Sequence, residues 1–309
     1  MTANPVDAVA KVLGPRARSN VALGPFTTYR VGGPAALLLE ARDGNDLALA
    51  QKAVSGSGVE VLVVGRGSNL LVSDGGFQGL AIVLGDGFAA IRLDGTDVEA
   101  GAAVSLPVLA RRTAAAGLAG LEWAVGVPGS VGGAVRMNAG GHGSDIRAVL
   151  RSVQLLDLST ASEPARTIRA ADLDLQYRRS AVRSHQIVTA AQFELRPGVR
   201  EAAEAEIAEI VRWRRANQPG GANSGSVFTN PPGDSAGRLI DASGLKGLRV
   251  GSATVSPRHA NFFQVDDGGS ADDVVALMKE VARVVLERTG VELTPEVHVV
   301  GSISPSTGG

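Results

Sequence analysis

The chain has 309 residues, which is long enough for a sizeable buried core and for two or three domains. Hydrophobic residues make up 44% and charged residues 20%, a balance typical of globular proteins rather than disordered ones. A net charge of −1 excludes a general basic surface for nucleic acid, and no apolar run reaches the roughly 18 residues of a membrane span. The absence of cysteine excludes disulfides and thiolate catalysis, and the N-terminus lacks a secretory signal, so we expect a cytoplasmic protein.

The first half of the chain predicts alternating strands and helices. Residues 1–18 suit a loose arm with one short helix. Buried apolar runs then predict strands at 36–39, 59–64, 80–84 and 89–93, and helical stretches are expected at 46–54 and 105–116. The second helix has Ser105 as its N-cap and Gly117 just past its end. Residues 149–195 are β-rich, with strands expected at 149–156 and 187–195.

The pattern changes near Pro197-Gly198, where a second α+β part begins. A helix is predicted at 201–216, with glutamates early and arginines late, as the helix dipole favours. Ser270 and Asp273 resemble a capping box that opens a helix at 271–288. Its buried stripe is expected to contain Val274, Leu277, Val281 and Val284. A last strand is predicted at 296–303, followed by a disordered tail at 304–309.

Several common catalytic motifs are absent. The sequence contains no Walker A motif, no His-Glu-x-x-His and no Gly-x-Ser-x-Gly. The four histidines, at 142, 185, 259 and 298, are scattered, so no metal site is predicted.

Three glycine-rich segments stand out at 61–74 (VLVVGRGSNLLVSD), 126–135 (GVPGSVGGAV) and 223–231 (NSGSVFTNP). Backbone N–H groups in the first segment suit an anion such as a diphosphate, and the uncharged second segment suits a flat ring system. The same residues also suit a plain strand–turn–strand corner and an ordered structural loop. The third segment offers hydroxyl and amide groups, but an ordinary turn explains them equally well.

Two charged segments carry further chemistry. Tyr177-Arg178-Arg179-Ser180 presents two guanidinium groups, which bind carboxylate or phosphate in bidentate fashion, although most such pairs are solvated turns. Glu296 opens an apolar strand, where partial desolvation favours its protonated form, although a salt bridge at the rim is the commoner case.

The order of these pieces resembles the MurB family of UDP-N-acetylenolpyruvoylglucosamine reductases over residues 20–301. The N-terminal segments that carry the resemblance are TTYRVGGPA at 27–35, GxGSNLL at 65–71, DGGF at 74–77, GLE at 120–122, GxPGxxGGA at 126–134 and YRxS at 177–180. The C-terminal ones are GSxFxNP at 225–231, GLKG at 244–247, HANF at 259–262 and PEV at 295–297.

The resemblance implies an α+β fold. We expect an FAD-binding region of p-cresol methylhydroxylase type, in two subdomains, at 19–196, and an α+β substrate-binding domain at 197–293. A strand at 294–303 would return to the FAD-binding region. The implied reaction is the NADPH-dependent reduction of UDP-N-acetylglucosamine enolpyruvate to UDP-N-acetylmuramate through non-covalent FAD, in peptidoglycan precursor synthesis, by a monomer.

The resemblance also implies roles for single residues. Arg178 matches the catalytic arginine, Ser226 the serine that protonates carbon, and Glu296 the catalytic glutamate. Positions that match cofactor contacts are Val64, Gly65, Gly67, Ser68, Asn69, Leu70, Pro128, Gly129, Ser130, Gly133, Asn138, Ala139 and Gly140. Positions that match substrate contacts are Tyr177, Arg178, Asn230, Lys246, His259 and Asn261.

Two departures from the family pattern are visible. His142 stands where many members carry tyrosine, so one flavin contact is expected to change. The only tyrosines are Tyr29 and Tyr177, so the chain resembles the class without the inserted tyrosine lid. Another FAD-dependent oxidoreductase of the same fold, or a non-catalytic nucleotide-sugar-binding paralogue, remains as an alternative.

Overall fold

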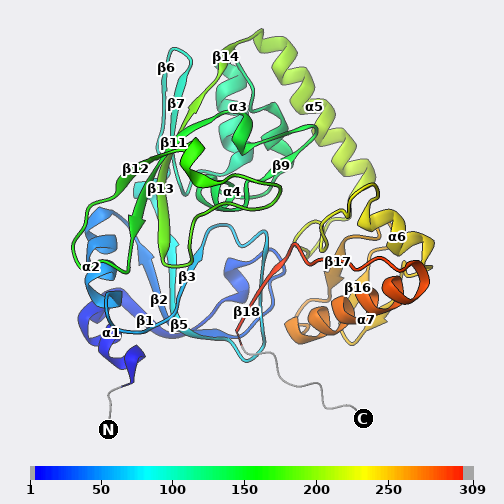
Figure 1. The fold of residues 1–309 in the computed structure, drawn as a ribbon, viewed down its shortest axis with the longest axis horizontal. Coiled ribbons are helices and arrows are strands. Elements are labelled where there is room, and N and C mark those ends of the chain that lie inside the picture. The colour runs from blue at the N-terminus through cyan, green and yellow to red at the C-terminus, as the bar shows by residue number, and fades with distance from the viewer. Residues whose placement is uncertain (1–3, 302–309) are drawn as a thin grey trace. The chain divides into compact units, whose positions relative to one another are not determined.

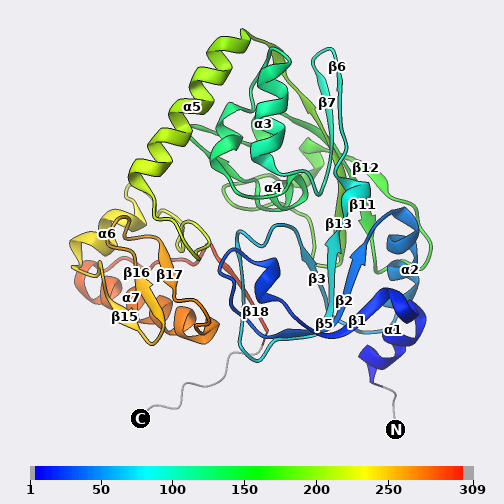
Figure 2. The same ribbon diagram turned by 180° about the vertical axis from the view of Figure 1, so that it is seen from behind.

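The computed structural model describes residues 4–301. Its α-helices are α1 Pro5–Leu13, α2 Gly44–Val54, α3 Leu106–Ala115, α4 Val131–Met137, α5 Arg200–Asn217, α6 Ala236–Ala242 and α7 Ala271–Thr289. Figures 1 and 2 show these helices and the strands from opposite sides. The strands up to the centre of the chain are β1 Ala17–Ala22, β2 Pro34–Ala41, β3 Val61–Val64, β4 Leu70–Val72, β5 Phe77–Leu84, β6 Ile91–Asp94, β7 Asp97–Gly101, β8 Leu118–Ala119, β9 Gly140–Gly141 and β10 Ser144–Asp145. The later strands are β11 Leu150–Asp157, β12 Arg166–Arg169, β13 Gln186–Glu194, β14 Arg196–Pro197, β15 Arg249–Val250, β16 Ala253–Val255, β17 Phe263–Val265 and β18 His298–Val300.

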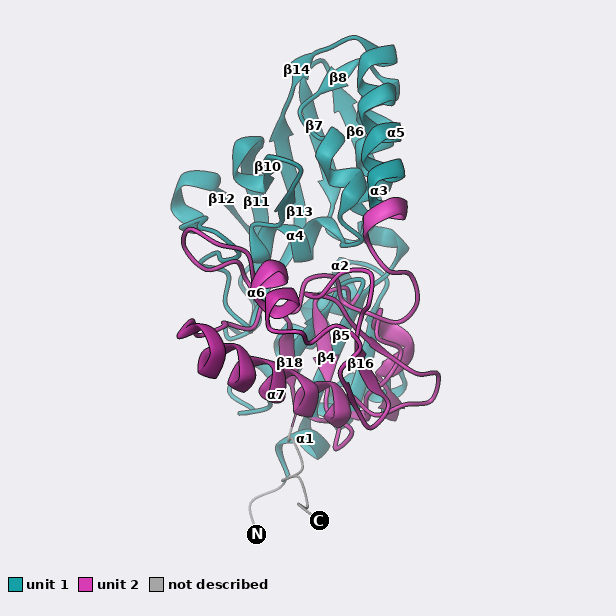
Figure 3. Ribbon diagram, turned by 90° about the vertical axis from the view of Figure 1, so that its right-hand side faces the viewer, with its two compact units in different colours: residues 1–19, 36–66, 78–214 teal, residues 20–35, 67–77, 215–309 magenta. Residues whose placement is uncertain are grey.

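The chain forms two compact units, coloured separately in Figure 3. Unit 1 contains residues 1–19, 36–66 and 78–214, and unit 2 contains residues 20–35, 67–77 and 215–309. This division differs from the predicted one, because the helix expected to open the second domain lies almost wholly in unit 1. The predicted cofactor residues from Gly67 to Leu70 fall in unit 2.

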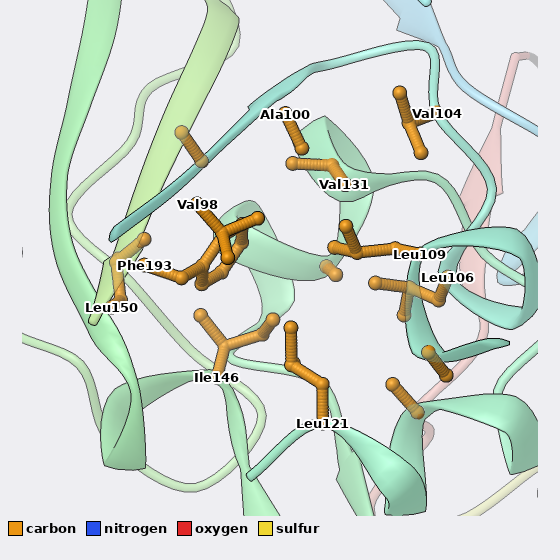
Figure 4. Packing of buried hydrophobic residues seen from close by; sticks show 14 of the residues in the cluster. Val98, Ala100, Val104, Leu106, Leu109, Leu121, Val131, Ile146, Leu150 and Phe193 are labelled. Atoms are coloured by element: carbon orange, nitrogen blue, oxygen red, sulfur yellow. The ribbon is translucent and has the colours of Figure 1, made fainter. Parts of the chain in front are cut away.

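Unit 1 holds most of a four-stranded sheet of order β1-β2-β5-β3 and all of a five-stranded sheet of order β12-β11-β13-β7-β6. In the first sheet β3 runs parallel to β5, with Val61 opposite Leu80. Antiparallel pairing joins the strands of the second sheet. Buried residues of α3, α4 and the strands form its core, including Val98, Leu106, Leu109, Val131 and Phe193 (Figure 4). This core fixes the loops that follow α3 and α4.

Unit 2 has an antiparallel sheet of order β15-β16-β17 that packs with α7. The predicted stripe of α7 is confirmed, because Val274, Leu277, Val281 and Val284 are all buried. A separate parallel pair joins β18 to β4, with His298 opposite Leu70. The C-terminal strand therefore lies beside the strand that follows the Gly65–Leu70 loop.

Most predicted elements are confirmed to within a few residues, but two details differ. The last strand covers only His298–Val300, and the predicted tail at 304–309 lies outside the described residues. Ser270 accepts the Asp273 N–H at 3.2 Å as expected of a capping box. The reciprocal bond is replaced, since the Asp273 carboxylate binds Ser252 and the Ser270 N–H donates to the Ser252 hydroxyl. No helix within 4–301 is long and apolar enough to cross a membrane.

Candidate functional site

The first two glycine-rich segments meet within unit 1 at Gly65 and Ser130. Gly65 directly follows β3, and a Cβ placed on it would collide with the Ser130 hydroxyl. Ser130 is the N-cap of α4, and its hydroxyl accepts the Gly133 N–H at 3.4 Å. The Leu106 N–H donates to the carbonyl of Gly129, the residue between Pro128 and Ser130, at 3.0 Å. This bond holds the turn that leads into α4. Glycine at 65 thus allows the close approach of two predicted cofactor segments.

Asn138 organises the loop that contains Ala139 and Gly140. It adopts a left-handed backbone conformation with a φ of 39°, and its side chain is buried. The amide donates to Asp145 at 3.1 Å and to the Gln176 carbonyl at 3.0 Å, and it accepts the Arg147 N–H at 3.0 Å. These bonds shape the backbone of the loop, so any contact that Asn138 makes with a cofactor is expected to be through its main chain.

The predicted catalytic arginine lies against this loop. Gln176 and Arg179 exchange backbone hydrogen bonds of 2.9 and 3.1 Å across a two-residue turn that contains Tyr177 and Arg178. Arg178 has a φ of 56°, a strained conformation for a residue with a side chain, and such strain gathers at functional sites. Its Nη2 donates to the Gly140 carbonyl at 3.0 Å, and its guanidinium carbon lies 4.9 Å from the centre of the Tyr177 ring.

The end of the first glycine-rich loop belongs to unit 2. Gly67 has a φ of 60°, and a Cβ there would collide with the Phe26 carbonyl. The loop continues through the half-buried Ser68 and Asn69 to Leu70, where β4 begins. The Asn69 side chain donates from Nδ2 to the backbone carbonyl of Glu296 at 2.9 Å. The loop is therefore bonded to the segment that carries the predicted catalytic glutamate.

Ser226 and Glu296 lie on adjoining segments of unit 2. The Glu296 N–H donates to the carbonyl of Val227, the residue after Ser226, at 2.8 Å. Ser226 pairs with Phe262 in a short antiparallel bridge. Both Ser226 and Glu296 are half-buried. The structure thus brings two of the three predicted catalytic residues onto neighbouring backbone.

Asn261 holds the serine segment through its side chain. Its Oδ1 accepts the Phe228 N–H at 3.0 Å, and its Nδ2 donates to the Phe228 carbonyl at 2.8 Å. Asn261 is only 2% exposed. We therefore expect any part that it has in substrate binding to be indirect.

The other predicted substrate residues lie nearer the surface of unit 2. Asn230 accepts the Ala236 N–H at 3.1 Å, and Lys246 donates to Asp241 at 2.6 Å. Burial, with a smaller effect from Lys246, holds the pKa of His259 below its ordinary value. His259 is therefore neutral near pH 7, where it offers hydrogen bonds rather than charge.

His142, the departure in the second loop, packs against α5. Its ring meets the Trp213 ring edge to face at 5.3 Å, and a Cβ on Gly126 would lie 3.0 Å from its Cδ2. Burial and, to a lesser extent, Arg214 lower the pKa of His142. His142 is therefore an uncharged packing group near neutral pH.

The hydrogen bonds made by the side-chain amides of Asn69 and Asn261 were not predicted from the sequence. Asn69 and Glu296 are separated by 227 positions, so no local pattern could pair them. Arg178 and Tyr177 belong to unit 1, whereas Ser226, Glu296, Asn230, Lys246, His259 and Asn261 belong to unit 2.

Comparisons with known proteins show the family of the chain. Residues 217–300 match the model for the C-terminal domain of UDP-N-acetylenolpyruvoylglucosamine reductase, and residues 35–161 match that for an FAD binding domain. A UDP-N-acetylenolpyruvoylglucosamine reductase from Rubrobacter xylanophilus is 43% identical over 299 residues, covering 96% of this chain and 99% of the relative. One from Heliobacterium modesticaldum is 45% identical over 278 residues, covering 89% of this chain and 88% of the relative.

A solved structure extends the likeness to three dimensions. The UDP-N-acetylenolpyruvylglucosamine reductase (MurB) of Thermus caldophilus superposes with a TM-score of 0.79 at 37% identity, covering 92% of this chain and 99% of that one. The FAD-binding fold expected from the sequence is confirmed by the match at 35–161 and by this structure. The chain belongs to the family of UDP-N-acetylenolpyruvoylglucosamine reductases.

Proposed function

We propose that this chain reduces UDP-N-acetylglucosamine enolpyruvate to UDP-N-acetylmuramate, with NADPH as the electron donor and FAD as the bound cofactor. The observation that carries the proposal is the backbone pairing of the segments that bear Ser226 and Glu296. Family membership over 96% of the chain supports the same reaction.

The residues present fit FAD. At Gly65 the backbone lies so close to the Ser130 hydroxyl that a Cβ would displace it, and the surrounding donors are uncharged backbone and hydroxyl groups. Such groups suit a diphosphate and a flat, partly apolar ring. Residues 64–70, 128–133 and 138–140 would hold the cofactor. When bound, FAD would supply the hydride transfer that links NADPH to the enolpyruvyl group.

The enolpyruvyl carbon is a poor hydride acceptor because the ether oxygen makes the double bond electron-rich. The carboxylate must take up the negative charge that develops during hydride addition. We assign Arg178 and Glu296 to polarising that carboxylate, since fixed charge and hydrogen bonds aimed at developing charge lower such a barrier.

We assign Ser226 to the proton transfer. Its Oγ–H gives a proton to the carbon next to the carboxylate, and that carbon's carbanion character makes a weak acid sufficient. Hydride at one carbon and a proton at the other convert the double bond to the single bond of the lactyl ether. Asn230, Lys246, His259 and Tyr177 are proposed to contact the substrate.

The product belongs to peptidoglycan precursor synthesis, so we propose a cytoplasmic enzyme whose loss would disturb cell shape and division. We also propose that the enzyme is a monomer. The direct test measures NADPH oxidation by the purified holoenzyme with and without the enolpyruvyl substrate. Mass spectrometry should show a product heavier than the substrate by two hydrogens. Oxidation that does not depend on the enolpyruvyl compound would reject the proposed substrate.

A further inference from the structure

Asn69 connects the first glycine-rich loop to the segment that bears Glu296. Its side-chain Nδ2 donates to the Glu296 carbonyl at 2.9 Å, and its backbone carbonyl accepts the His298 N–H at 3.0 Å. All three residues belong to unit 2. Asn69 therefore makes two hydrogen bonds to the C-terminal segment, one from its side chain to Glu296 and one through its main chain to His298.

The side-chain bond extends the ladder of backbone bonds between β4 and β18. The parallel pairing of β18 with β4 begins at His298 and Leu70. Glu296 lies two residues before His298, level with the loop rather than with β4. At this position the Asn69 amide takes the place of a strand N–H and carries the ladder one step further.

Glu296 is thereby held from both sides. Its N–H donates to Val227, beside Ser226, at 2.8 Å, while its carbonyl accepts from Asn69. A residue fixed at both its N–H and its carbonyl has little freedom of backbone rotation, so the direction of its Cα–Cβ bond, and with it the point from which the carboxylate starts, is fixed as well.

We infer that Asn69 is a positioning residue for Glu296, and that its side chain serves the glutamate segment rather than the cofactor. The inference rests on the proposed function, because it assigns to Glu296 a part in the substrate step. Replacing the donor by an acceptor should turn the Glu296 carbonyl away from the loop, with the carboxylate displaced in consequence.

The first test needs no cofactor and no turnover. Asn69→Asp keeps the size of the side chain but sets a carboxylate oxygen against the Glu296 carbonyl, and Asn69→Ala removes the donor alone. Asn45→Asp, at an exposed position on α2 in unit 1, controls for the added charge. In the apoprotein we expect the Glu296 and His298 amides to exchange about tenfold faster in both Asn69 variants and at the wild-type rate in the control.

The second test separates the half-reactions under anaerobic conditions at saturating FAD. Reduction by NADPH should stay within about threefold of wild type, whereas reoxidation by the enolpyruvyl substrate should slow by about 10- to 100-fold. In a Glu296→Gln background the same Asn69 change should slow reoxidation by less than about threefold, since residues that act as a unit are not additive.

Unchanged amide exchange, or an equal loss in both half-reactions, would overturn the inference and return Asn69 to cofactor binding. A full Asn69 effect in the Glu296→Gln background would overturn it as well. A wild-type enzyme that is reduced by NADPH but not reoxidised by the substrate would reject the proposed function, and with it the catalytic part of the inference. The exchange result would remain interpretable in that case, so the two failures are distinguishable.

Discussion

The contact between Gly65 and Ser130 allows a substitution to be tested together with its own rescue. Alanine at position 65 would place Cβ against the Ser130 hydroxyl, whereas the Ser130 Cβ lies at an ordinary 3.6 Å. Gly65 is not among the residues with positive φ, so the collision accounts for the cost of the change. Overpacking of this kind costs about 1–3 kcal/mol. Ser130→Ala alone loses the cap to Gly133, which costs about 0.5 kcal/mol given its 3.4 Å length.

The double variant should recover what the single glycine variant loses. We expect Gly65→Ala to weaken FAD binding by about 5- to 150-fold. The double variant Gly65→Ala with Ser130→Ala should lose less binding free energy than the two single variants together, by about 1–3 kcal/mol. Flavin fluorescence titration of the apoproteins measures the affinity, and thermal unfolding measures the stability. Gly220→Ala is the matched control, because a Cβ there meets nothing within 4 Å. Additive effects within about 0.5 kcal/mol would refute the packing argument.

Three further predictions concern single side chains. Asn261→Leu should lower the free energy of unfolding by about 2–6 kcal/mol, because it leaves both backbone groups of Phe228 buried without the amide that binds them, and a thermal midpoint unchanged within about 2 °C would contradict this. Burial raises the pKa of Tyr29 to about 12, so its folded-state pKa exceeds the unfolded value of 10.0. The stability that depends on the neutral phenol is present below pH 10.0 and is lost as pH rises toward about 12. Tyr29→Phe should therefore make the melting temperature depend less on pH across that range. Arg178→Lys removes the planar fork that reaches the Gly140 carbonyl, so reoxidation of the enzyme by substrate should slow by roughly 10- to 100-fold while reduction by NADPH changes little, and equal losses would point instead to a defect of the loop.

Local patterning was sufficient for the regular elements. Valine and leucine recur every three or four residues in α7, which places one stripe in the core of unit 2, and the burial of those residues confirms it. The apolar runs that became β11 and β13 likewise followed from hydrophobicity alone. Such patterns record which face is buried, and burial is the dominant local signal.

Long-range hydrogen bonds decided what patterning could not reach. The capping box at Ser270 lost its reciprocal bond because Ser252, 18 positions earlier, offered a hydroxyl to the same N–H. The strand after Glu296 is shorter than its apolar run because pairing with β4 begins only at His298.

The candidate site shows the same division. Ser226, Arg178 and Glu296 were selected because they match the catalytic positions of the family that the order of the motifs resembles, and their roles stay predictions. Asparagine offers both a donor and an acceptor, so its partner cannot be read from its neighbours in sequence. The bonds of Asn69 and Asn138 emerged only with the folded backbone.

The central claim is that one enzyme takes hydride from NADPH and passes it to the enolpyruvyl group of a UDP-sugar. Anaerobic absorbance spectroscopy of the purified protein tests it most directly, with NADPH added first and UDP-N-acetylglucosamine enolpyruvate second. The account predicts that the flavin absorbance is lost on the first addition and returns on the second. Flavin that stays bleached after the second addition would contradict the account and identify a flavoenzyme with a different acceptor.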